Sequence, residues 1–177
     1  VEGDWSNAAF FLVAAALGGT INCADLKLNS SQGDRRILQE LEKFGAKVTI
    51  SANVLTVSPG ELQAASVDMS EIPDLLPILA VLASYAPGRS VLHNAARLRL
   101  KESDRLSAVR ELLQKIGGKV EETADSLIIY GQKELAGAAS IDSFNDHRIA
   151  MSAAVAALKC KAAVTINNPE VVRKSYP

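Results

Sequence analysis

The chain has 177 residues, of which 48% are hydrophobic and 5% aromatic, and its formal net charge is −1. This composition can fill a substantial core, built mostly from alanine and aliphatic side chains. The balanced charge and the scarce aromatic residues argue against a nucleic-acid partner, and no apolar stretch reaches the length of a membrane span. Two cysteines, Cys23 and Cys160, and two histidines are too few to predict a disulfide framework or a metal site.

The predicted elements repeat along the chain. Asp4, Asp74 and Asp146 each precede an apolar run, and the spacings between them are 70 and 72 residues. Each run predicts a helix, and a short strand-like segment follows each helix. We expect the helices at 8–17, 75–85 and 149–158, and the strands at 20–23, 90–93 and 164–167.

The first two units continue with a second, amphipathic helix that ends at a glycine C-cap, Gly45 or Gly117. A predicted hairpin follows each of these helices, with its turn at Asn53 or Asp125. The third unit stops before its second helix. The amphipathic helices are expected at 35–44 and 106–116, and the hairpin strands at 48–50, 54–57, 120–122 and 127–130.

The first helix of each unit is apolar on nearly every side, which is typical of a helix buried on every side. Since nothing indicates a membrane, we expect these helices at the centre and the strands outside them. The predicted fold is an α/β, inside-out domain of three units, each helix-strand-helix-strand-strand, with the third unit truncated. We expect residues 1–177 to form a single domain. Because Val1 is not an initiator methionine, we also expect a piece of a longer protein.

One charged run stands out, Leu100-Lys101-Glu102-Ser103-Asp104-Arg105-Leu106. Ser103 and Asp104 are good N-cap residues for the amphipathic helix that follows. A helix N-terminus favours anions, and two cations placed there indicate a phosphate or carboxylate site, with Glu102 available for proton transfer. The alternative is a solvated helix start with local ion pairs.

Other charged groups also lie at helix starts. Asp74 and Asp146 precede two of the apolar helices, and each has the simpler interpretation of an N-cap. His147 has the simpler interpretation of an ordinary polar residue. Arg148 is harder to explain, because a cation in the first turn opposes the helix dipole unless an anion lies there. Lys174, after the third unit's strand, is uninformative alone.

Together these groups predict an anion site with two carboxylates for proton transfer. No Ser-His-Asp order, phosphate-binding glycine loop or metal-ligand spacing competes with this prediction. Gln32-Gly33-Asp34 is adequately explained as a helix cap. The alternative from another class is a non-catalytic anion-binding module, in which the charged clusters would be scattered in space.

Five motifs follow one another from the first residue to the last. They are Glu2-Gly3-Asp4-Trp5-Ser6, Asp68-Met69-Ser70 with Ile72-Pro73-Asp74, Lys101 to Leu106, Asn145 to Met151, and Lys174-Ser175-Tyr176-Pro177. Together they resemble the 5-enolpyruvylshikimate-3-phosphate synthase family. The resemblance implies two lobes of three such units each, so that this chain is most of one lobe and the other lobe is absent.

The resemblance implies a cytoplasmic transferase of the shikimate pathway that serves chorismate and aromatic amino acid biosynthesis. Its members transfer the enolpyruvyl group of phosphoenolpyruvate to the 5-hydroxyl of shikimate 3-phosphate and release phosphate, by addition and then elimination. No metal or organic cofactor is implied. We expect the fragment alone to be inactive, because the missing lobe would supply water exclusion and half of the substrate contacts. The expected partners are the two substrates and that missing lobe. The sister enzyme that transfers enolpyruvate to UDP-N-acetylglucosamine is the nearest alternative.

Roles for individual residues also follow from the resemblance. Asp74 is implied as the base at the shikimate hydroxyl, and Glu102 as the proton-transfer group at the methylene carbon. Asp74 and Lys101 are implied contacts of shikimate 3-phosphate. The phosphoenolpyruvate contacts are implied to be Arg105, Arg148, Lys174 and His147.

One departure concerns the shikimate phosphate. Some members have an Asn-Trp pair where this chain has Arg97-Leu98, and that asparagine contacts the phosphate. Arg97 supplies a charged substitute, so we include it among the expected shikimate 3-phosphate contacts.

Overall fold

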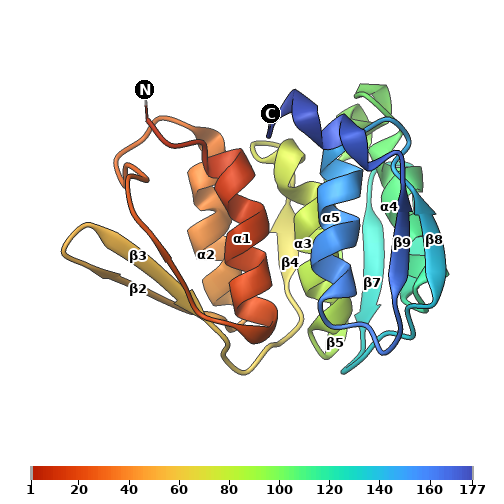
Figure 1. The fold of residues 1–177 in the computed structure, drawn as a ribbon, viewed down its shortest axis with the longest axis horizontal. Helices are drawn as coiled ribbons and strands as arrows, with labels where there is room; N and C mark the ends of the chain where they lie inside the picture. The colour runs from red at the N-terminus through yellow and green to blue at the C-terminus, as the bar shows by residue number, and fades with distance from the viewer. Residues whose placement is uncertain (1, 177) are drawn as a thin grey trace.

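The computed structural model, which describes residues 2–176, has helices at its centre and small sheets on its outside (Figure 1). The predicted inside-out α/β class is therefore confirmed. Within these residues the α-helices are α1 (Trp5–Gly18), α2 (Ile37–Lys43), α3 (Leu76–Tyr85), α4 (Arg105–Lys115) and α5 (His147–Ala157). The 3-10 helices are η1 (Gly33–Arg36), η2 (Pro73–Leu75), η3 (Ala96–Leu100) and η4 (Pro169–Lys174).

The strands form separate sheets of three, four and two members, in the orders β1-β3-β2, β4-β5-β7-β6 and β8-β9. The β4-β5 and β8-β9 pairs are parallel and the other pairs are antiparallel. Over the described residues the strands are β1 (Ile21–Cys23), β2 (Lys47–Ser51), β3 (Val54–Ser58), β4 (Ser66–Asp68), β5 (Gly88–His93), β6 (Lys119–Glu122), β7 (Leu127–Gly131), β8 (Ala139–Asp142) and β9 (Val164–Asn167).

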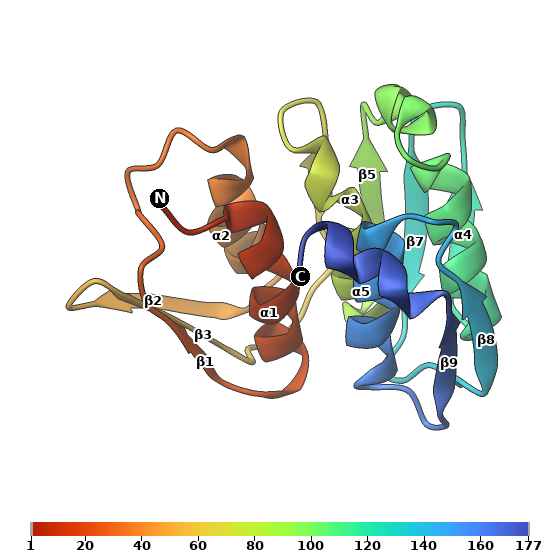
Figure 2. The same cartoon turned by 45° about the horizontal axis from the view of Figure 1, so that its top comes forward.

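The central helices α1, α3 and α5 contact one another, and Figures 1 and 2 show them side by side. All ten residues of α3 are buried, as its apolar sequence predicts. The prediction of complete burial is wrong for α1, whose Phe11 is 45% exposed, and for Leu158 just after α5, which is 69% exposed. No helix of residues 2–176 is long and apolar enough to cross a membrane.

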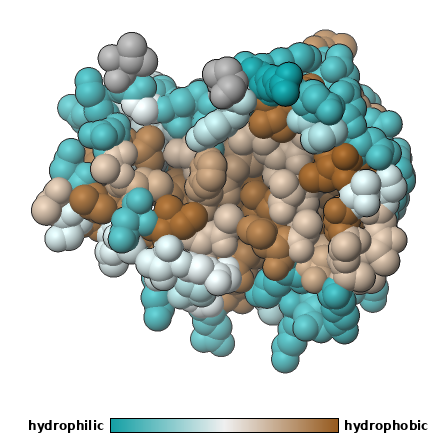
Figure 3. All heavy atoms as spheres, in the orientation of Figure 1, coloured by the Kyte–Doolittle hydropathy of each residue, from teal (hydrophilic) through white to brown (hydrophobic). Residues whose placement is uncertain are grey.

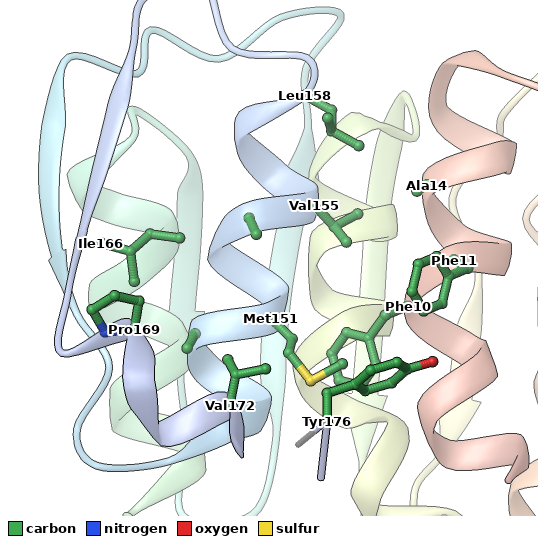
Figure 4. A pocket seen from close by; sticks show the side chains of 12 residues that line it. Phe10, Phe11, Ala14, Met151, Val155, Leu158, Ile166, Pro169, Val172 and Tyr176 are labelled. Atoms are coloured by element: carbon green, nitrogen blue, oxygen red, sulfur yellow. The ribbon is translucent and has the colours of Figure 1, made fainter. Parts of the chain in front are cut away.

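These exposed side chains border an open apolar groove between α1 and α5. Figure 3 shows hydrophobic atoms gathered on this face, and Figure 4 shows the side chains that line a pocket of about 470 Å³. Within the groove the rings of Phe11 and Tyr176 pack against each other, with centroids 5.9 Å apart. Its lining includes Phe10, Phe11, Met151, Val155, Leu158 and Tyr176.

The second helices pack between the central helices and the sheets. α4 contacts α3, α5 and β6, and α2 contacts α1 and β2. The helix expected at 35–44 begins as the 3-10 helix η1 and becomes α-helical only at Ile37. Gly45 has φ 87°, and a Cβ there would lie 2.1 Å from the carbonyl oxygen of Glu61. That position therefore requires glycine.

The structure adds two strands that the sequence analysis omitted. β4 precedes α3 and β8 precedes α5, and each pairs in parallel with the strand that follows the same helix. Each omitted strand has three or four residues and buries one of them, Val67 or Ile141, so its pattern is too short to recognise. In the first unit the described residues place no strand beside the outer edge of β1.

Candidate active site

The N-terminal ends of α1, α3 and α5 lie at the same end of the helix bundle, at the upper edge of Figure 1. Asp4 caps α1, and Asp146 caps α5 by accepting a hydrogen bond of 2.9 Å from the backbone N–H of Arg148. Asp104 caps α4 by accepting from Ser107. Asp74 lies within η2 and caps no helix, so the simple N-cap interpretation is wrong for this residue.

Arg105 is the centre of an ion-pair network at this end. Its side chain is 1% exposed, although it belongs to the first turn of α4. Nε donates to Asp146 at 2.8 Å, Nη1 to Asp74 at 2.8 Å and Nη2 to Glu102 at 2.7 Å. A buried guanidinium needs such partners, and its fork lets it join three carboxylates from three segments of the chain.

Asp146 is the fully buried member of the network, with 0% exposure. Burial alone would raise the pKa of this carboxyl, but Arg105, the Arg148 amide and the Ser103 hydroxyl stabilise its charge, so its pKa is lowered. The Ser103 hydroxyl donates to it at 3.0 Å. Asp146 is thus a cap and also the main anchor of Arg105, a second role that its position before a helix did not reveal.

Asp74 faces three cations. Its carboxylate oxygens lie 2.8 Å from Arg105, 3.3 Å from Arg148 and 3.5 Å from Lys101. Burial opposes ionisation of Asp74, but Arg148, Arg105 and Lys101 outweigh it and lower the pKa of the carboxyl. The anion that Arg148 requires near the start of α5 is therefore Asp74 itself.

The remaining expected contacts lie around this network. His147 is buried, and burial together with Arg148 lowers its pKa, which favours the neutral imidazole. Lys174 Nζ donates to the backbone carbonyl of Asn145 at 3.2 Å, close to the start of α5. Arg97 is exposed and donates to the carbonyl of Ser70.

A shallow depression of about 380 Å³ next to Asp74 contains a residue that the sequence analysis explained as a cap. The carboxylate of Asp34 accepts a hydrogen bond from the hydroxyl of Ser6 and lies in this depression with Asp74 and Arg97. Burial raises the pKa of Asp34, and the nearby charge of Asp74 adds to this effect. Asp34 lies in this depression because η1 packs against the start of α1. The sequence pattern alone does not show this contact.

The network connects five of the expected site residues directly, so the charged clusters are not scattered as the non-catalytic alternative required. The arrangement offers carboxylates for proton transfer beside cations for anionic oxygens. Among residues 2–176, no three His, Cys, Asp or Glu side chains lie close enough to hold a metal ion together. The five are Asp74, Lys101, Glu102, Arg105 and Arg148.

Comparison with known proteins identifies the family of this chain. The family model described as EPSP synthase (3-phosphoshikimate 1-carboxyvinyltransferase) matches residues 1–177. The chain belongs to the EPSP synthase family. The resemblance of the five sequence motifs is thereby confirmed.

Individual EPSP synthase relatives agree with the family match. The 3-phosphoshikimate 1-carboxyvinyltransferase of Clostridium acetobutylicum is 48% identical over 177 residues, which are 100% of this chain and 41% of the relative. That of Pyrococcus abyssi is 46% identical over 100% of this chain and 42% of its own length. The solved EPSP synthase of Acinetobacter baumannii is 30% identical, with a TM-score of 0.86 over 99% of this chain and 44% of that chain. The chain therefore spans about two fifths of the length of these relatives.

Proposed function

We propose that this chain is one lobe of an enzyme that transfers the enolpyruvyl group of phosphoenolpyruvate to the 5-hydroxyl of shikimate 3-phosphate and releases phosphate. The observation that carries the proposal is the Arg105 network, which holds Asp74 and Glu102 near each other, with Lys101 and Arg148 beside Asp74. Membership of the EPSP synthase family supports the choice of substrates. We expect the cytoplasm as the compartment of this shikimate-pathway step.

The reaction needs a base and an acid. In the proposed addition step, Asp74 accepts the proton of the 5-hydroxyl while the hydroxyl oxygen bonds to the central carbon of phosphoenolpyruvate. Glu102 delivers a proton to the methylene carbon, which becomes a methyl group. In the elimination step, that methyl group returns a proton and phosphate leaves. A proton donor and a proton acceptor placed on one network suit this sequence.

The cations are proposed to hold the anionic groups of both substrates. Lys101 and Arg97 serve the phosphate of shikimate 3-phosphate. Arg148 and Lys174 serve phosphoenolpyruvate, with the neutral His147 as a hydrogen-bonding neighbour.

We also assign Arg105 to phosphoenolpyruvate. It has four hydrogen bonds to carboxylates within the described residues, which leave one of its five N–H groups for a ligand. Arg105 therefore contributes mainly by orienting the carboxylates.

We propose that the chain alone does not turn over substrate. It spans 41% of its Clostridium acetobutylicum relative, and an enolpyruvyl transfer in water-exposed surroundings would lose the positioning and water exclusion of a closed site. The partner required is the rest of the enzyme, which we expect to supply the second lobe.

The test is reconstitution. The chain is mixed or co-expressed with the remaining segments of the Clostridium acetobutylicum relative, and phosphate release is measured with both substrates present. We expect turnover with the two parts together and none with either part. Asp74→Asn and Glu102→Gln should each reduce kcat by at least about 100-fold.

The matched control for these variants is Glu71→Gln, which alters an exposed carboxylate at the edge of the same depression. It should keep most of the activity. Full activity in the Asp74 and Glu102 variants, or turnover by the chain alone, would refute the proposal.

A further inference from the structure

The segment that carries two of the proposed site residues has little structure of its own. Lys101, Glu102 and Ser103 lie between η3 and α4 and belong to no helix or strand. Leu100, just before them, is 89% exposed, and the nearest buried apolar side chain on this side is Leu98 within η3. At its far end, Ser103 bonds to Asp146 and Asp104 caps α4. The side chains of Lys101 and Glu102 pair with Asp74 and Arg105, and a further contact holds the near end, which is the backbone just before them.

Arg99 fixes that end. Its Nε donates to the carbonyl of Ala124 at 2.9 Å, and Nη2 donates to the carbonyl of Thr123 at 2.6 Å. Nη2 also lies 2.7 Å from Glu122, and Nη1 lies 2.9 Å from Asp104. One guanidinium therefore joins the β6–β7 hairpin to the two sides of the Lys101–Ser103 segment. We call Arg99 with these four partners the Arg99 clamp.

The hairpin side of the clamp is itself held in place. Glu122 is only 15% exposed, and it also accepts from Arg110 at 2.8 Å and from the Ser107 hydroxyl at 3.0 Å, both on α4. The carboxylate that receives Arg99 is thus fixed by the helix that begins with Arg105. The clamp thus joins a carboxylate held by α4 to a segment that belongs to no helix or strand.

We propose that Arg99 is a positioning residue for the proposed reaction, acting through Lys101 and Glu102. Exposed ion pairs contribute little to stability, so the main effect of the clamp is geometric. A displacement of about 1 Å at a reacting group lowers turnover by about 100-fold. This inference rests on the proposed function for its effect on rate, but not for its effect on the segment.

The chain offers a matched control. Arg99→Met removes the clamp, whereas Arg110→Met removes the other cation on Glu122 and leaves every contact of the segment in place. Backbone order parameters from NMR relaxation of the chain should fall at residues 100–103 from about 0.85 to below about 0.6 in Arg99→Met only. In the reconstituted enzyme, kcat should fall by about 100-fold in Arg99→Met and by less than about threefold in Arg110→Met.

The conservative variant separates geometry from charge. Arg99→Lys keeps the cation but cannot reach two carbonyls and two carboxylates at once, so it should behave like Arg99→Met. Rescue by lysine, unchanged order parameters, or equal losses in Arg99→Met and Arg110→Met would overturn the inference. If the reconstituted wild type shows no turnover, the proposed function fails, and the order parameters alone decide whether Arg99 fixes the segment.

Discussion

Arg105→Met is the most informative perturbation of the network, because the structure predicts both its size and its pH dependence. The substitution keeps a side chain of similar length but leaves Asp146, at 0% exposure, without its cation. Removing one partner of a buried ion pair costs about 3–5 kcal/mol. A domain of this size is stable by about 5–15 kcal/mol, so the loss is a large fraction of the total.

The measurement is urea and thermal unfolding of the chain. At about 2–4 °C per kcal/mol for a chain of this length, we expect the midpoint temperature to fall by about 6–20 °C. The control is Arg110→Met. The Arg110 side chain is 38% exposed, so its ion pair with Glu122 should contribute less than about 1 kcal/mol to the free energy of unfolding. Adding Asp146→Asn to Arg105→Met should recover part of the loss, because the uncompensated charge disappears.

The pH dependence should change sign between wild type and variant. In the wild type the folded-state pKa of Asp146 is lowered, so its pairing stabilises the fold above the unfolded pKa of about 3.9 and is lost as the pH falls through the folded value. In Arg105→Met, burial remains without the cation and raises that pKa. The variant should therefore gain stability as the pH falls from 7 toward 5. A loss below about 1 kcal/mol, or parallel stability curves in this window, would refute the reasoning.

Two further predictions concern the fold. Gly131→Ala would place a Cβ 1.7 Å from the carbonyl oxygen of Ala86, so we expect the free energy of unfolding to fall by about 3 kcal/mol, and an unchanged urea midpoint would contradict this contact. Asp4→Ala removes the acceptor of the Ser6 and Asn7 amides at the start of α1 and should cost about 1 kcal/mol in the same assay. Asp4→Asn should retain most of that stability, and equal losses in both variants would exclude capping as the cause.

The helices were predictable because they repeat a strong local signal. The apolar run of α3 is buried at all ten positions, and Asp104 and Asp146 are caps as their places before predicted helices indicated. The exposure of Phe11 was not predictable in the same way. The sequence pattern of a helix shows which of its faces is apolar. The exposure of that face depends on whether another element covers it.

The sequence placed several charged residues at helix starts, but it did not predict how their side chains would pair. Local spacing indicated that Lys101, Glu102 and Arg105 belong together. It could not indicate that Arg105 would be buried against Asp146, because that pair joins residues 41 positions apart. The same limit hid Asp34, whose bond to Ser6 spans 28 residues. Side-chain pairs between distant residues leave no period in the sequence.

The separation of the three sheets has a consequence for how the chain folds. Each sheet is built from one continuous stretch, residues 21–58, 66–131 and 139–167, and no strand is shared. Each sheet therefore closes loops only within its own stretch of chain, and none between stretches. Cooperativity between the units comes mainly from the contacts of α1, α3 and α5. Damage to one sheet should thus unfold its own unit first, whereas damage to α3 should unfold the whole molecule.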